Sequence, residues 1–191
     1  MPAGRPRQFN PDDVLDCAVE IIWRDGPFAH SLNELAALLG LTKPALARMF
    51  GGKDDFLAAV LKRYFDKVCI PLEGALDTAD TVQSVAEIYL GYYSDALSQK
   101  PVGPFTGCLL AASTDATAVQ NGLVPETTRD LNSRTRNHLA DVLKAVGADA
   151  PEELATYLYG QGIALAFLSR SGAGPDALRR FRKRALAGVG V

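Results

Sequence analysis

Cysteine and histidine are scarce in this chain of 191 residues, and their scarcity excludes several kinds of site. The three cysteines, Cys17, Cys69 and Cys108, are far apart and include no CxxC pair, which argues against a disulfide framework or a zinc module. The two histidines, His30 and His138, are also far apart, and the sequence has no HExxH, GxSxG or phosphate-loop motif. The sequence therefore predicts no enzyme, no metal site and no cofactor.

Long apolar runs are absent as well. No stretch approaches the ~18 apolar residues of a membrane-spanning helix, and the polar start MPAGRPRQFNPDD lacks the apolar segment of a signal peptide. A net charge of −2 and a pI of about 5.7 neither favour nor exclude nucleic acid, because the distribution of charge decides that. We expect a cytoplasmic protein without a membrane partner.

Alternation of β-branched residues is rare too, while Gly and Pro fall where helices should end. The pattern predicts an all-α protein of about nine helices. The first four predicted helices start at Asn10, Ser31, Thr42 and Lys53 and are ended by Gly26, Gly40, Gly51 and Pro71. The remaining helices are predicted over 80–99, 105–117, 125–146, 152–170 and 174–187.

The third helix, in the stretch LTKPALARMFGGK, contains a proline that does not break it. Thr42 suits the N-cap position, so Pro44 lies in the first turn, where no intrahelical N–H partner is lost. Leu41, just before the cap, can pack on Leu46 as a hydrophobic staple. The proline is therefore part of a helix start.

The second and third helices fit a helix-turn-helix. A capping box of Ser31 and Glu34 starts the second helix. Ala36 and Gly40 supply the small residue and the glycine turn that a tight helix crossing needs. The leucines of both helices would pack onto the first and fourth helices, which leaves one face of the third helix free.

The free face of the third helix is cationic. The sequence has no acidic residue from Leu35 to Lys53. The residues expected to face outward from the third helix are Lys43, Pro44, Ala45, Ala47 and Arg48. Lys and Arg there can pair with DNA phosphates, and Arg can also read guanine. Lys53 lies beside the N–H groups that start the fourth helix. An ordinary solvated face is the alternative on charge alone.

A basic arm precedes the first helix. Arg5 and Arg7, in the segment GRPR, could reach into a minor groove. Together with the capped short helix and the Ala36–Gly40 spacing, this arm favours DNA binding over a solvated face.

Residues 4–64, which read GRPRQFNPDDVLDCAVEIIWRDGPFAHSLNELAALLGLTKPALARMFGGKDDFLAAVLKRY, resemble the N-terminal DNA-binding domain of the TetR/AcrR family of bacterial repressors. GCLLAAS at 107–113 and GIALAFLSRSGAGPDALRRF at 162–181 resemble the C-terminal domain of many members. The resemblance implies a DNA-binding domain over 1–52 and a helical ligand-binding and dimerisation domain over 53–191. It also implies a homodimer that binds a palindromic operator in double-stranded DNA and is released by a small-molecule effector.

Carried over by position, the resemblance implies that Ser31 and Lys53 meet phosphates, that Lys43 contacts the DNA backbone and that Thr42 caps the recognition helix. Ala47 stands where the family usually has a Tyr that touches phosphate, which removes one backbone contact. His30 replaces a frequent Thr. The predicted DNA-binding residues are Arg5, Arg7, His30, Ser31, Thr42, Lys43, Pro44, Ala45, Ala47, Arg48 and Lys53.

Aromatic residues are the candidates for an effector pocket in the second half of the chain. Aromatics at helical spacing can equally be plain core, and Tyr92 and Tyr93 cannot both face inward. Inward charges are few, so we expect a mostly apolar, uncharged effector. The predicted ligand-binding residues are Tyr64, Phe65, Tyr89, Tyr92, Tyr93, Phe105, Cys108, Tyr157 and Phe167.

Small residues in the predicted helix 152–170 suggest a close helix–helix seam between two subunits, because glycines weaken a helix by ~1 kcal/mol each and need a packing reason. Close packing within one subunit is the alternative. The predicted dimer-interface residues are Tyr159, Gly162, Ala166, Leu178 and Phe181.

Two further functions compete with a ligand-responsive repressor. Cys108 follows a glycine at a predicted helix start, which can lower a thiol pKa, so a thiol-based redox-sensing regulator is one alternative. A helical interaction protein that has lost DNA binding, as Ala47 allows, is the other.

Overall fold

The computed structural model describes residues 10–96, 107–114 and 122–190, and within these ranges every secondary-structure element is a helix, joined to the next by short turns and loops. Helix α4 (Lys53–Tyr64), the π-helical segment η1 (Phe65–Cys69) and α5 (Ile70–Leu76) follow one another without a break. Helix α6 (Val82–Gly91) likewise continues into the π-helical segment η2 (Tyr92–Ala96). Counted as continuous rods, the described helices number nine, and the all-α prediction is confirmed.

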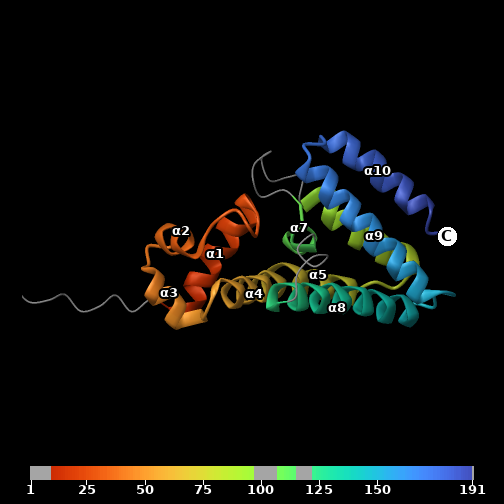
Figure 1. Ribbon diagram of the computed structural model, residues 1–191. Helices are drawn as coiled ribbons and strands as arrows, with labels where there is room; N and C mark the ends of the chain where they lie inside the picture. The colour runs from red at the N-terminus through yellow and green to blue at the C-terminus, as the bar shows by residue number, and fades with distance from the viewer. Residues whose placement is uncertain (1–9, 97–106, 115–121, 191) are drawn as a thin grey trace, which may run out of the picture.

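Helices α1 (Pro11–Asp25), α2 (Leu32–Leu38) and α3 (Lys43–Phe50) form one end of the molecule (Figure 1). We call this part, residues 10–52, the head. Its helix starts are capped locally, as predicted: Asn10 accepts a hydrogen bond from the Asp12 N–H at 3.1 Å. The head is held together by apolar side chains that all three helices bury, among them Ile22, Leu35 and Leu46.

The rod that starts with α4 connects the head to the remainder, residues 53–190, which we call the body. Helix α4 packs against α1 on one side and against α8 (Leu123–Ala145) on the other. The predicted stop at Pro71 was wrong, because the helical rod continues to Leu76. Pro71 lies just after the π-helical segment η1, where the regular α-helical hydrogen-bond pattern is already interrupted, so the rod accommodates its missing N–H.

The body is a bundle around helix α9 (Pro151–Arg170). Helix α8 packs on α4 and α9, while α6, η2 and α10 (Pro175–Ala187) pack on α9 from other sides. The short helix α7 (Leu109–Ser113) lies between the head and α9 in Figure 1. It is shorter than the predicted helix over 105–117, of which only 107–114 is described.

Aromatic residues form the centre of the body and reach into the head. Tyr64, Phe65 and Tyr89 are almost completely buried. The rings of Trp23 on α1 and Tyr64 on α4 meet edge to face, with centroids 5.1 Å apart. In the described part of the chain, no helix is both long and apolar enough to cross a membrane.

Candidate functional site

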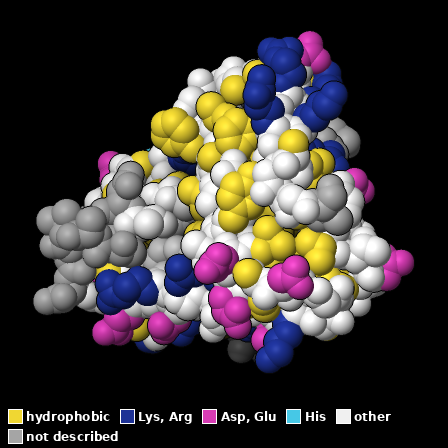
Figure 2. All heavy atoms as spheres, turned by 90° about the vertical axis from the view of Figure 1, so that its right-hand side faces the viewer, with side chains coloured by type: hydrophobic (Ala, Val, Ile, Leu, Met, Phe, Trp, Pro, Cys, Tyr) yellow, Lys and Arg dark blue, Asp and Glu magenta, His cyan; other side chains and the backbone are white. Residues whose placement is uncertain are grey.

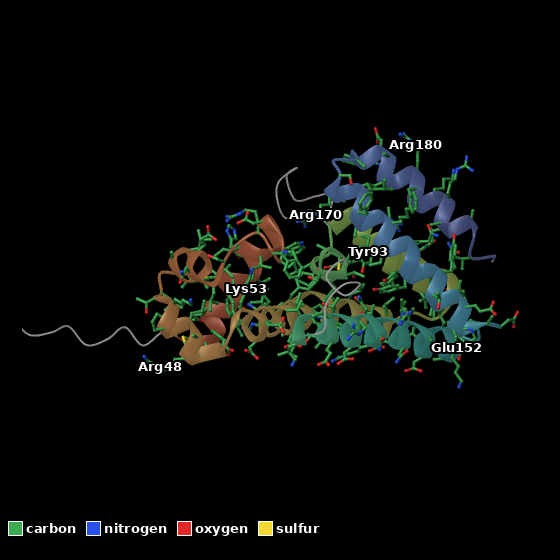
Figure 3. The ribbon with its side chains drawn as sticks, in the orientation of Figure 1. Arg48, Lys53, Tyr93, Glu152, Arg170 and Arg180 are labelled. Atoms are coloured by element: carbon green, nitrogen blue, oxygen red, sulfur yellow. The ribbon has the colours of Figure 1, made fainter. Side chains whose placement is uncertain are left out.

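Helix α3 presents a cationic face to solvent. Lys43, Pro44 and Arg48 are exposed, whereas Leu46 on the opposite side is fully buried. Arg48 lies at the far end of the head in Figure 3. Among the described residues, no carboxylate lies within ion-pair distance of Lys43 or Arg48. Ala45 and Ala47 are partly exposed between the two cations, so small side chains let this face approach another surface closely.

The turn between α2 and α3 sets the angle of this face. Gly40 has a φ of +69°, a conformation that side chains disfavour. The Leu41 N–H then donates to the Ala36 carbonyl at 2.8 Å, and Ala36 is buried where the two helices cross. The structure thus uses Ala36 and Gly40 in the way a helix-turn-helix requires.

Two hydroxyl groups flank the cationic face. Thr42 caps α3 by accepting a hydrogen bond from the Ala45 N–H at 3.4 Å. Ser31 accepts from the Glu34 N–H at 3.3 Å, and its own N–H donates to the Glu34 carboxylate at 2.7 Å. Both residues are exposed. Because each hydroxyl oxygen accepts in its cap, its proton can still be donated to a phosphate.

His30 faces its own subunit. Its Nε2 lies 2.7 Å from the Asp25 carboxylate at the end of α1. Hydrogen bonds first from Arg24 and then from His30 hold the pKa of Asp25 well below its usual range. Asp25 therefore stays ionised and orients the imidazole, which makes His30 a support for the loop before α2.

The start of α4 has a carboxylate close to its N–H groups, which the sequence predicts as a phosphate site. The Gly52 N–H, at the N-cap position, donates to the Asp55 carboxylate at 2.8 Å. Lys53 is partly exposed beside it and forms no ion pair within the described part of the chain. Lys53 is therefore a cation at this helix start that remains a predicted phosphate-binding residue. Arg5 and Arg7 of the predicted arm, and Phe105 of the predicted pocket, lie outside the described residues.

Most of the predicted pocket tyrosines are packed against one another. Tyr64, Tyr89, Tyr92 and Tyr93 surround a cavity of only about 20 Å³, together with Cys69 and Cys108. That is room for about one water molecule. Phe65 is buried under the guanidinium of Arg134, 4.7 Å from its ring centre. In this conformation these aromatics are core, which is the alternative that the sequence left open.

The other predicted pocket residues lie on separate cavities. Cys108 and Phe167 border a hollow of about 560 Å³ between the head and α9. Tyr157 borders another of about 530 Å³ at the α8–α9 turn and donates a hydrogen bond to the Ala185 carbonyl at 2.9 Å. The structure therefore does not bring the predicted ligand-binding residues together into one site.

The environment of Cys108 weakens the redox alternative. The side chain is buried, and burial raises the pKa of the thiol. Burial also raises the pKa of Cys69. The thiolate is the reactive form, so neither cysteine has the low pKa of a redox sensor.

The predicted dimer interface needs correction. Gly162, Ala166 and Leu178 are buried inside the subunit. A Cβ on Gly162 would lie 2.8 Å from the rings of Tyr89 and Tyr93. The glycine therefore exists to let α9 approach α6 and η2 within one chain. Tyr159 and Phe181 are half-buried, so part of each is accessible to a partner.

Long-range contacts that local sequence does not reveal join the head to the body through Trp23, and join α4 to α8 within the body through Asp54. The Trp23 indole N–H donates to the Gly107 carbonyl at 2.9 Å, and Arg170 donates to the Trp23 carbonyl at 3.4 Å. The Asp54 carboxylate accepts from the Leu123 and Val124 N–H groups at 2.6 and 3.2 Å. No local sequence signal identifies these pairs, because their partners are at least 69 residues apart.

The cations of α10 lie apart from the head. Figure 2 views the end of the molecule opposite the head, where Lys and Arg side chains gather at the top over α10 and hydrophobic side chains run through the middle. These cations and α3 therefore cannot contact the same short stretch of DNA. In the part of the chain that the structure describes, no cluster of His, Cys, Asp and Glu could hold a metal ion.

Comparison with known families identifies the head. A family model described as bacterial regulatory proteins, tetR family, matches residues 14–60. The chain is 26% identical over 141 residues to the HTH-type transcriptional repressor ComR of Escherichia coli, a match covering 73% of this chain and 66% of ComR. It is 34% identical over 73 residues to the HTH-type transcriptional repressor BdcR of Escherichia coli, covering 38% of this chain and 37% of BdcR. The matched segments span less than two thirds of either relative.

The likeness in fold extends over the whole chain. A cysteine mutant of the TetR family transcriptional regulator CifR, complexed with 26-bp double-strand operator DNA, has a TM-score of 0.81 to this structure at 22% identity. The superposition covers 96% of this chain and 98% of CifR. The body therefore has the fold that accompanies this kind of head.

Proposed function

We propose that this chain is a transcriptional repressor of the TetR family that binds operator DNA as a homodimer, a proposal supported by its similarity to members of that family. In this proposal α3 enters the major groove of the operator. A small-molecule effector bound in the body changes the position of the head and releases the DNA.

The observation that carries the proposal is the exposed face of α3. Lys43 and Arg48 project from a helix whose other side is anchored by the buried Leu46, so the cations are held on a rigid element. Lys53, Ser31 and Thr42 surround this face and supply contacts to phosphate. Phosphate contacts fix the register on the duplex, while a base contact by Arg48 would give specificity.

A dimer follows from the size of one head. A single helix-turn-helix contacts only one half of a DNA site. A dimer places its two recognition helices about 34–36 Å apart, which is one turn of the DNA helix. The outer side of α9 and α10 supports this role. Gly160 is exposed with no heavy atom near its Cβ position, and Phe181 is half-exposed beside Ala177 and Gln161. Such a surface lets two helix pairs approach closely.

The test is a DNA-binding titration with the region upstream of the coding sequence. We expect a saturable, salt-dependent shift with two subunits per site, and a dimer by light scattering of the free protein. Scrambling one half of the protected site should weaken binding strongly. A monomer in light scattering, or no shift at low salt, would reject the proposal and favour the interaction protein without DNA binding.

A further inference from the structure

The hollow between head and body has the dimensions of a ligand site. Its volume is about 560 Å³, which lies within the range of small-molecule pockets. Pro27, just after α1, borders it on the head side, while Ala111 of α7 and Ile163 of α9 border it on the body side. Its wall is therefore mostly apolar and is built by both parts of the molecule.

One cation borders this apolar wall. Arg170 lies at the end of α9 that faces the head (Figure 3). Within the described ranges, no carboxylate lies within ion-pair distance of its guanidinium. Its hydrogen bond goes to the Trp23 carbonyl, and at 3.4 Å this is a long one. A planar guanidinium without an anionic partner is suited to a bidentate bond with a carboxylate.

We infer that this hollow binds a small amphipathic carboxylic acid, with its carboxylate on Arg170 and its apolar part against Ala111, Ile163 and Phe167. The inference rests on the proposed function, for which it names the chemical class of effector. It replaces the uncharged effector expected from composition. A phosphate fits less well, because it brings more charge and more acceptor oxygens than one guanidinium satisfies.

Arg170 connects this ligand to the head. The carbonyl that it contacts belongs to Trp23 near the end of α1, and the Trp23 indole is bonded to Gly107 on the body side. A carboxylate that accepts two parallel hydrogen bonds from the Arg170 guanidinium draws the guanidinium away from the Trp23 carbonyl. Binding therefore removes one of the contacts that hold α1 against the body.

The experiment is a titration of the full chain with octanoate and 1-naphthoate, each compared with its neutral counterpart, octanol or 1-naphthamide. Trp23 is the only tryptophan of the chain, and its carbonyl accepts a hydrogen bond from Arg170, so its fluorescence reports on changes at this contact. We expect saturable binding of at least one acid with a change in emission, and weaker operator binding when the acid is present. The neutral compounds should bind more weakly and leave the emission unchanged.

Variants separate the charge from the fold. Arg170→Gln should weaken binding of the acid at least tenfold and leave binding of the neutral compound unchanged. Arg170→Lys keeps the charge and should give an intermediate loss, which preserves the test if the glutamine variant does not fold. Arg180→Gln is the matched control, because Arg180 is exposed on α10 away from the hollow, and it should bind like the wild type.

Three results would overturn the inference. They are failure of both acids to bind at millimolar concentration, equal binding of the acid by Arg170→Gln, and occupation of the hollow by a second copy of the chain. The last would appear as a dimer that Phe167→Ser converts to monomer while neither acid binds the wild type. If one of these results is found while the protein still binds its operator, the inference fails but the proposed repressor function stands. If the wild type does not bind the operator even without ligand, the repressor function fails, and ligand binding in the hollow is judged separately.

Discussion

The head and the body differ in the range of their stabilising contacts. In the head, the caps of α1, α2 and α3 join residues two or three positions apart, such as Ser31 with Glu34. At the junction with the body, Trp23 bonds to a carbonyl 84 residues away, and within the body Asp54 bonds to amides 69 and 70 residues away. The head is thus specified by short-range contacts, whereas its placement against the body depends on long-range contacts, one of which the proposed acid would remove.

The largest effect should follow from removing the cations of α3. Each contact of this kind contributes about 1–3 kcal/mol, so Lys43→Ala with Arg48→Ala should lower operator affinity about 30-fold or more. The melting temperature should stay constant, because both side chains are exposed. Fluorescence anisotropy over a series of salt concentrations measures the affinity. Exchanging Arg179 and Lys183 of α10 for Ala is the control, and an equal loss there would refute the separate role of the head.

A glycine pair tests how tightly the head is seated. Gly107 has a φ of +87°, and a Cβ there would lie 2.8 Å from the Ala166 carbonyl. Gly172 has the same φ of +87° but no atom within 4 Å. Gly107→Ala should therefore reduce the free energy of unfolding by about 1–3 kcal/mol more than Gly172→Ala does, the range typical of overpacking. Urea denaturation gives the free energy of unfolding of both variants. Equal decreases would mean that the Ala166 carbonyl moves aside for the new Cβ at little cost.

Neighbouring aspartates distinguish local from long-range capping. Asp55 caps its own helix at Gly52, while Asp54 caps the start of α8. Loss of a cap costs about 1 kcal/mol, so Asp54→Ala and Asp55→Ala should have similar effects on global stability. Hydrogen exchange should tell them apart. Leu123 and Val124 should exchange faster only in Asp54→Ala, and the Gly52 amide only in Asp55→Ala; faster exchange at all three in both variants would contradict the distinction.

The smallest effect concerns the ion pair between α1 and α4. Arg63, bonded to Asp16 at 2.6 Å, and then Lys67 lower the pKa of Asp16 from 3.8 to about 2. Because the folded-state value is the lower one, this stabilisation is fully present above pH 3.8 and is lost as the pH falls towards 2. The pair is exposed enough for solvent to screen it, so its contribution to stability should be small. Asp16→Asn should flatten the stability of the protein between pH 4 and 2 in urea titrations, and an unchanged slope would assign the acid sensitivity to other groups.

Much of the head could be predicted from the sequence because its signals are short-range. The capping box at Ser31, the first-turn Pro44 and the turn glycine at Gly40 each depend on neighbours within a few residues. The prediction also identified Lys43 and Arg48 as exposed, since the leucines of α3 define its buried side. His30 was harder to place, because its partner Asp25 lies across a turn.

The body resisted prediction for the opposite reason. Helical spacing predicts that Tyr64, Tyr89 and Tyr93 face inward. It does not predict whether their rings line an open cavity or pack closely against one another. Likewise, Gly162 signals a close approach without naming the partner, which proved to be two tyrosines of the same chain.

The sequence by itself determined that the chain is helical, where its helices begin and that one short helix carries an exposed cationic face. These properties come from hydrogen bonds and side-chain periodicity within one or two helical turns. Only the tertiary structure decided which aromatics are core, which acid caps which helix and where Arg170 meets both Trp23 and an apolar hollow. Such pairings depend on how distant segments pack, and apolar packing is non-directional, so local sequence does not specify the partner.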